Sequence, residues 1–162
     1  GHLNMLSVGE KAIDFTLDST EGKFTLSEHA IDSPILLYFF PVINGRTCTD
    51  YISSMIERNE EFKELGVDII NINHEPIDNH RAWIEHTGSP FVDLSDPELT
   101  ICKAYDAIVK KAKSESLIGK TNRALFLIDK DMTIRYAWCA DIPSDTVPIG
   151  TLISEIKDAL DI

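Results

Sequence analysis

The sequence predicts an α/β fold with a central mixed sheet, flanking helices and an amino-terminal β-hairpin. A continuous apolar run over residues 35–40 is typical of a strand buried on both faces. Apolar residues at helical spacing follow from Cys48 to Leu65, and a second apolar run covers residues 67–73. Because a strand, helix, strand order within one sheet implies a parallel crossover, these segments predict the centre of an α/β sheet.

Short alternating segments predict two hairpins. Turn residues at 19–22 separate two alternating runs near the amino terminus, which predicts the first hairpin. A polar turn at 130–133 separates two β-favouring runs and predicts an antiparallel pair. The strands expected from these patterns cover residues 14–17, 23–26, 124–129 and 134–140, with a short extended piece at 91–94.

Proline and glycine mark the outer helices. Pro76 opens a predicted helix that Gly88 ends, and Pro97 opens another. Apolar residues at helical spacing predict a terminal helix over residues 149–160. The stretch 108–122 has no clear period and is rich in lysine, so it is either a solvated loop or the rim of an active site.

Composition and charge narrow the class of protein. The length of 162 residues and the 43% hydrophobic content fit one domain over residues 5–162, and we interpret residues 1–4 as an expression remnant before Met5. The formal charge of −12 repels phosphate, so nucleic acid and anionic membrane surfaces are not expected partners. The longest apolar run, residues 34–43, is about half a bilayer span. We therefore expect a soluble, cytoplasmic protein.

Cysteine and histidine usage speaks against structural metals and disulfides. The three cysteines, one of them Cys48, show neither CxxC spacing nor a zinc pattern. His74, His80 and His86 are six residues apart and do not share a helix face, so they are interpreted as surface or capping residues. We expect no metal and no cofactor. In a reducing cytosol a thiol of lowered pKa is then the available redox group.

Cys48 is the leading candidate for that thiol. It follows a buried strand, a proline and a short loop, at or just inside the start of a predicted helix. Free N–H groups and the helix dipole stabilise a thiolate at such a position. The alternative is a buried, inert cysteine, and position alone does not choose between the two.

The segment from Pro41 to Cys48 resembles the proline-to-cysteine loop of peroxiredoxins, with the seven-residue offset intact. The bacterioferritin-comigratory branch of that family is the most similar. The resemblance implies a thioredoxin-like fold and a thiol-dependent peroxidase. It extends along almost the whole chain, through the opening hairpin, the segment after the third strand and an arginine-led strand, at residues 9–17, 94–97 and 123–131.

The resemblance also implies roles for three residues. Cys48 becomes the peroxidatic cysteine, Pro41 shields it from stray reactions, and Arg123 supports the thiolate and polarises the peroxide. These roles agree with chemistry, because thiolate attack on an O–O bond leaves negative charge on oxygen, which a fixed positive charge stabilises. An arginine keeps that charge in a protein.

The loop departs from the family pattern at two positions. Gly45 stands where the family has a threonine whose hydroxyl contacts the peroxide; Thr47 or Asn44 takes over that contact, or the loop is rebuilt. Tyr51 stands where a glutamate usually helps to hold the arginine. The alternative to a peroxidase is therefore a redox sensor or binding module on the same fold, with weak or no peroxidase activity.

The second half of a peroxidase cycle needs another thiol. Where the comigratory branch often has a resolving cysteine this chain has Ser53, so an external thiol or a thioredoxin-like reductant is expected. Cys102 and Cys139 are the candidates for an internal resolving thiol. A thiol–disulfide oxidoreductase is less favoured, because such enzymes have two cysteines separated by two residues, and Gly45 and Tyr51 occupy the possible partner positions of Cys48. The substrate is hydrogen peroxide or an organic hydroperoxide, and the protein is a monomer or a homodimer.

Overall fold

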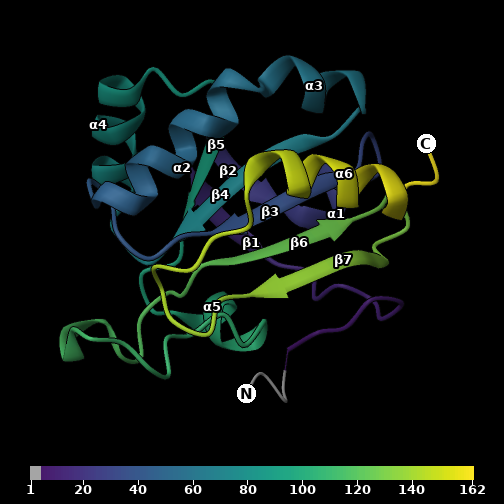
Figure 1. Cartoon of the computed structure of the whole chain (residues 1–162). Helices are drawn as coiled ribbons and strands as arrows, with labels where there is room; N and C mark the ends of the chain where they lie inside the picture. The colour runs from purple at the N-terminus through teal and green to yellow at the C-terminus, as the bar shows by residue number, and fades with distance from the viewer. Residues whose placement is uncertain (1–4) are drawn as a thin grey trace.

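Seven strands form one mixed sheet at the centre of the molecule (Figure 1). The computed structural model describes residues 5–162, so the expectation about residues 1–4 lies outside it. The strand order across the sheet is β2-β1-β5-β4-β3-β6-β7. The elements in chain order are β1 (Thr16–Ser19), β2 (Gly22–Thr25), α1 (Leu26–Ala30), β3 (Ile35–Phe39), α2 (Arg46–Glu57), α3 (Asn59–Glu64), β4 (Asp68–Asn73), α4 (Ile77–Thr87), β5 (Val92–Ser95), α5 (Thr100–Ala104), the 3₁₀ turn η1 (Glu115–Leu117), β6 (Ala124–Ile128), β7 (Ile134–Cys139) and α6 (Ile149–Ala159).

The centre of the sheet has the predicted arrangement. β3 pairs in parallel with β4, and β4 in parallel with β5. β6 lies antiparallel to β3, and both predicted hairpins, β1–β2 and β6–β7, are present. Every residue of β3 is buried, because its two neighbours and two layers cover it. The sheet is therefore mixed, and the predicted α/β thioredoxin-like class is confirmed.

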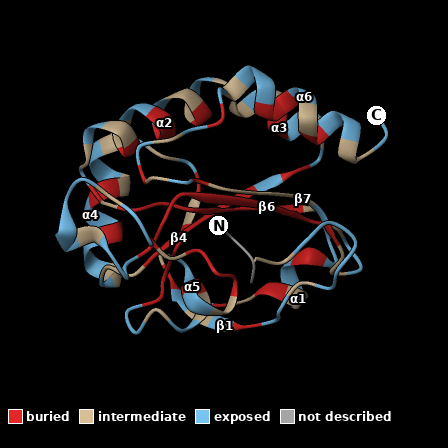
Figure 2. Cartoon of the chain, turned by 60° about the horizontal axis from the view of Figure 1, so that its bottom comes forward, coloured by how far each residue is buried: buried red, intermediate tan, exposed pale blue. Residues whose placement is uncertain are grey.

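Alternation along the strands divides the core into two clusters on opposite faces of the sheet. In β3, Leu36 and Tyr38 point to the face covered by α2, α3, α4 and α6, called here the α2 face. Ile35 and Leu37 point to the face covered by α1 and α5, called the α5 face. Figure 2 shows the buried sheet between these two layers. No helix within residues 5–162 combines the length and the apolar character that crossing a membrane requires.

The single helix expected from Cys48 to Leu65 is wrong, because two helices occupy this segment. α2 ends at Glu57, and Arg58 leaves the helical conformation with φ −102° and ψ 13°. The carbonyl of Arg58 then accepts the N–H of Glu61 as α3 begins, and the Arg58 side chain pairs with the Glu61 carboxylate. Apolar residues of both helices pack on the α2 face, so the hydrophobic period runs through the break.

The helix expected to open at Pro97 begins later than the sequence predicts. This helix, α5, begins at Thr100, after Leu99 in the left-handed region with φ 62°. The Asp96 carboxylate accepts the N–H of Cys102 at 2.8 Å and that of Ile101 at 3.0 Å. This side chain, rather than the proline, supplies the partners that the start of the helix needs.

His80 is a third correction, because it is neither a surface nor a capping residue. It lies fully buried on α4, and its Nδ1 is 2.8 Å from Asp93 Oδ2. The other oxygen of Asp93 accepts a hydrogen bond from Asn71 at 3.1 Å. Partners of this kind allow a polar ring to enter the core, which the spacing of the histidines does not reveal.

Candidate active site

Cys48 lies in the first turn of α2, as the sequence predicts. Gly45 precedes the helix in an extended conformation, with φ −69° and ψ 144°, and the N–H of Thr49 donates to its carbonyl at 2.8 Å. Helix geometry leaves the N–H groups of the first turn without intrahelical acceptors, which makes this end of the helix electropositive. Cys48 is only 3% exposed, so its sulfur lies in a poorly solvated site at this end of the helix.

Arg123 contacts Cys48 from the sheet that lies beneath α2. It directly precedes β6, on the alternation that points Leu125 to the α2 face, and it is 1% exposed. Its Nη2 donates to Cys48 Sγ at 3.4 Å, and its Nε donates to the carbonyl of Pro143 at 3.2 Å. Its Nη1 donates to the hydroxyl of Tyr38. The sheet thus holds a cation against the sulfur at the start of the helix.

The partners of Arg123 are unusual for a buried cation. Within residues 5–162, no aspartate or glutamate forms an ion pair with it. Tyr51, at the position where the family has a glutamate, donates its hydroxyl hydrogen to the carbonyl of Val147 at 2.6 Å. The Tyr51 ring centroid lies 6.0 Å from the Arg123 guanidinium carbon. Burial lowers the pKa of Arg123, but Tyr38 and Cys48 raise it, and the net pKa lies above the ordinary value.

A cavity of about 280 Å³ opens over Cys48 and Arg123. Three chain segments line it: the loop and helix start at 41–48, residues 112–117 of the lysine-rich stretch, and residues 142–144. Val42, Leu117 and Ile142 give it apolar walls. Of the two interpretations of residues 108–122, the structure supports the active-site rim.

The loop residues named from the sequence take different places around this cavity. Pro41, Gly45 and Thr47 line it, whereas Asn44 is exposed and does not. Asn44 instead adopts a left-handed conformation with φ 64°, which lets the loop turn into the helix. A Cβ placed on Gly45 would lie 3.3 Å from Val42 Cβ. The loop is therefore packed tightly around the glycine.

Two residues at the end of the neighbouring strand hold the loop in place, and neither is among the site residues predicted from the sequence. The N–H of Ile43 donates to Glu75 Oε2 at 2.9 Å, and Asn73 Nδ2 donates to the carbonyl of Pro41 at 3.5 Å. The Oδ1 of Asn73 also accepts the N–H of Glu75 at 2.8 Å. Because β3 and β4 are parallel, their carboxyl ends meet at one edge of the sheet. The signal in the sequence that could have identified them is the presence of polar residues at the end of the apolar run 67–73 and just after it.

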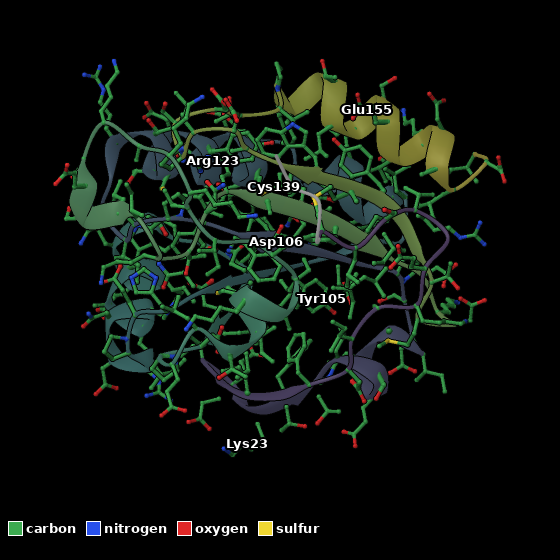
Figure 3. The ribbon with its side chains drawn as sticks, turned by 90° about the horizontal axis from the view of Figure 1, so that it is seen from below. Lys23, Tyr105, Asp106, Arg123, Cys139 and Glu155 are labelled. Carbon is green, nitrogen blue, oxygen red and sulfur yellow. The ribbon has the colours of Figure 1, made fainter. Side chains whose placement is uncertain are left out.

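The other two cysteines belong to the opposite face of the sheet. Cys102 is fully buried in the α5-face cluster, with its sulfur 3.4 Å from Thr121 Oγ1, and burial raises its pKa. Cys139 is half-buried, packs against the same cluster, and has its pKa raised to about 11 by burial. Figure 3 views the molecule from this side and labels Cys139 and Tyr105.

A buried thiol that faces a guanidinium at a helix start, on a thioredoxin-like sheet, is typical of a thiol-based redox protein. Residues 8–137 match the AhpC/TSA family, and the chain belongs to that family as a peroxiredoxin, a thiol-dependent peroxidase. A peroxiredoxin of Thermoplasma volcanium is 32% identical over 155 residues, covering 92% of this chain and 70% of the relative.

Two further comparisons agree with the branch and the fold. A putative peroxiredoxin bcp of Coxiella burnetii is 27% identical, covering 82% of this chain and 88% of its own length, which supports the bacterioferritin-comigratory branch. The crystal structure of a mutant peroxiredoxin 6 of Arenicola marina superposes with a TM-score of 0.86 at 20% identity. It covers 96% of this chain and 74% of that protein, and it supports the fold alone.

Proposed function

We propose that Cys48 is the peroxidatic cysteine and reduces a peroxide by direct thiolate attack. The observation that carries this proposal is the 3.4 Å contact between Arg123 Nη2 and Cys48 Sγ beside the cavity. A buried cation is costly unless an anion compensates it, and the Cys48 thiolate is the anion that this site offers. The electropositive start of α2 adds to the same effect.

The reaction follows from this geometry. The Cys48 sulfur attacks one oxygen of the peroxide, so that an S–O bond forms while the O–O bond breaks. The sulfur loses two electrons to the leaving oxygen, which takes a proton from solvent and departs as an alcohol or water. Arg123 and the first-turn N–H groups stabilise the charge on that oxygen, and Pro41 closes one wall of the cavity.

The walls of the cavity bear on the choice of peroxide. Val42, Leu117 and Ile142 present apolar surface next to the sulfur. An alkyl or aryl group placed there leaves water, whereas hydrogen peroxide gains nothing from such walls. We therefore propose an organic hydroperoxide as the preferred substrate, with Thr47 and the backbone around Gly45 beside its oxygens.

An external thiol completes the proposed cycle. It condenses with the Cys48 sulfenic acid, releases water and forms a mixed disulfide, and a second thiol then restores Cys48. The positions of Cys102 and Cys139 support this route, because both pack on the α5 face while Cys48 packs on the α2 face. A reducing compartment such as the cytoplasm supplies thiols or a thioredoxin-like reductant.

Rapid mixing with hydrogen peroxide and with cumene hydroperoxide, in the presence of dithiothreitol, tests the proposal. Cys48→Ser is expected to lose about a thousandfold or more of the rate, whereas Cys139→Ser stays within about twofold. Intact-mass analysis should place the first added oxygen on Cys48, and cumene hydroperoxide should react faster than hydrogen peroxide.

Two results would contradict it. If Cys48 reacts no faster than free cysteine, the peroxidase proposal fails and a redox sensor or binding module becomes the better interpretation. If nonreducing peptide maps show a bridge from Cys48 to Cys102 or Cys139, the external-thiol cycle is wrong.

A further inference from the structure

The hydroxyl of Tyr38 occupies a place at the site that neither the motif nor the family resemblance assigns. It accepts a hydrogen bond from Arg123 Nη1, while the neighbouring Nη2 of the same guanidinium reaches Cys48 Sγ. Nε is held by the carbonyl of Pro143. Each of the three nitrogens of the planar guanidinium makes one of these contacts, so fixing any two nitrogens sets the direction of the third.

Tyr38 is itself held rigidly. It lies in β3, opposite Leu125 of β6, and its side chain is fully buried on the α2 face. Its ring centroid is 5.4 Å from that of Tyr51 and 6.0 Å from that of Phe40. A hydroxyl mounted on a central strand and packed by two aromatic rings has little freedom to move.

We infer that Tyr38 is a positioning residue: its hydroxyl replaces the absent carboxylate and directs the Arg123 guanidinium at the Cys48 sulfur. This inference rests on the proposed function in taking Cys48 as the nucleophile. Tyr51 contributes the face of its ring beneath the guanidinium, since its own hydroxyl is engaged by Val147.

The replacement changes the charge of the site as well as its geometry. Burial raises the pKa of Tyr38 and of Tyr51, so both phenols are neutral at physiological pH. A glutamate holding the arginine would share the positive charge, whereas two neutral phenols leave it unshared. Among the side chains described between residues 5 and 162, Arg123 donates hydrogen bonds to the Tyr38 hydroxyl and the Cys48 sulfur, and no carboxylate is among its partners.

Tyr38→Phe tests the inference, because it removes the hydroxyl and keeps the ring. The matched control is Tyr105→Phe, which removes another largely buried tyrosine hydroxyl, one that donates to the carbonyl of Ile13 at 2.6 Å on the α5 face. Two readouts are used at neutral pH: the ultraviolet absorbance of the Cys48 thiolate, taken as the difference from a Cys48→Ser partner, and the rate of reaction with cumene hydroperoxide.

We expect Tyr38→Phe to lower the thiolate absorbance and to slow the peroxide reaction about tenfold, as for the loss of a hydrogen bond to a charged group. Tyr105→Phe should change neither readout. If Tyr38→Phe keeps the absorbance and the rate of the parent protein, or if Tyr105→Phe loses as much, Tyr38 only fills space. If the parent shows the thiolate absorbance but consumes no peroxide, the proposed function fails and the positioning role stands.

Discussion

Cys48 and Cys102 occupy the same position in two different helices. Each is the third residue after the helix cap, which is Gly45 for α2 and Leu99 for α5. Each is buried, with an exposed fraction of 3% for Cys48 and 0% for Cys102. Their surroundings differ in the sign of one charge. Cys48 contacts the guanidinium of Arg123, whereas the start of α5 is occupied by the carboxylate of Asp96.

A position at the start of a helix does not by itself lower the pKa of a thiol, because the pKa of Cys102 is raised. At α5 the N–H groups of Ile101 and Cys102 already have an anion, and that carboxylate adds to burial in raising the pKa of Cys102. At α2 the N-cap residue is a glycine, which has no side chain to cap the helix, and Cys48 in the first turn lines the cavity. The nearest charge therefore differs in sign between two thiols at the same helix position, and under the proposed function the thiol beside the cation is the reactive one.

Removing the cation from the Cys48 site should have the largest effect. Arg123→Met keeps an unbranched side chain but leaves the thiol without a charged partner, so Cys48 should come to resemble Cys102. We expect the rate constant for peroxide to fall about a hundredfold or more, equivalent to about 3 kcal/mol of transition-state stabilisation. Stopped-flow measurement with cumene hydroperoxide checks this value.

Arg135→Met is the control, because Arg135 is a partly exposed residue of β7 that pairs with Asp129. Its peroxide rate should match that of the unchanged protein. An Arg123→Met variant that still reacts at the original rate would show that the helix start alone activates Cys48.

Removing the anion from the Cys102 site should have a smaller effect, on stability. Asp96→Asn weakens two hydrogen bonds to backbone N–H groups of α5, and we expect a loss of about 1–2 kcal/mol in the free energy of unfolding. The same change lowers the pKa of Cys102, so its alkylation by iodoacetamide should become faster while remaining slower than that of Cys48.

Urea unfolding and peptide mass analysis measure the two effects. Asp78→Asn, in the exposed first turn of α4, is the matched control and should change neither quantity appreciably. Unchanged stability in Asp96→Asn would mean that the carboxylate does not hold α5 as described.

Cys139 should give the smallest effect, a dependence of stability on pH. Burial raises its pKa from 9.0 to about 11, so the folded state favours the neutral thiol. The contribution of Cys139 to the free energy of unfolding is full below pH 9.0 and is lost as the pH rises through about 11. Because Cys139 is partly exposed, we expect only about 1 kcal/mol. When the pH is raised from 9.0 to about 11, the free energy of unfolding measured in urea should fall less for Cys139→Ala than for the parent protein. An equal fall in both proteins would show that Cys139 is not the cause.

Much of the fold could be predicted because it depends on local patterns. The apolar run of β3 and the turn before β7 each predict one feature correctly, and the helical spacing after Cys48 predicts the helical segment that α2 and α3 share. The break at Arg58 could not be predicted, since apolar residues on both sides of it pack against the same face. The placement of Cys48 at a helix start was likewise readable from the strand, proline and loop that precede it.

The rest of the site depends on contacts between distant segments. Tyr38 reads as one more apolar residue of a buried strand, and only the register with β6 brings its hydroxyl to Arg123. The sequence predicts only a loop residue at Glu75, whereas the parallel pairing of β3 with β4 places its carboxylate beside the N–H of Ile43. The spacing of residues along a sequence does not predict contacts between side chains of distant segments.

The tight packing of Gly45 against Val42 limits which side chains position 45 can hold. A threonine at position 45 would bring its Cβ within 3.3 Å of the Val42 Cβ, so one side chain must give way by a few tenths of an ångström. A threonine at position 45 should therefore fit more easily beside a residue smaller than valine at position 42. The effect of any side chain added to the loop thus depends on how far its neighbour three positions earlier can shift.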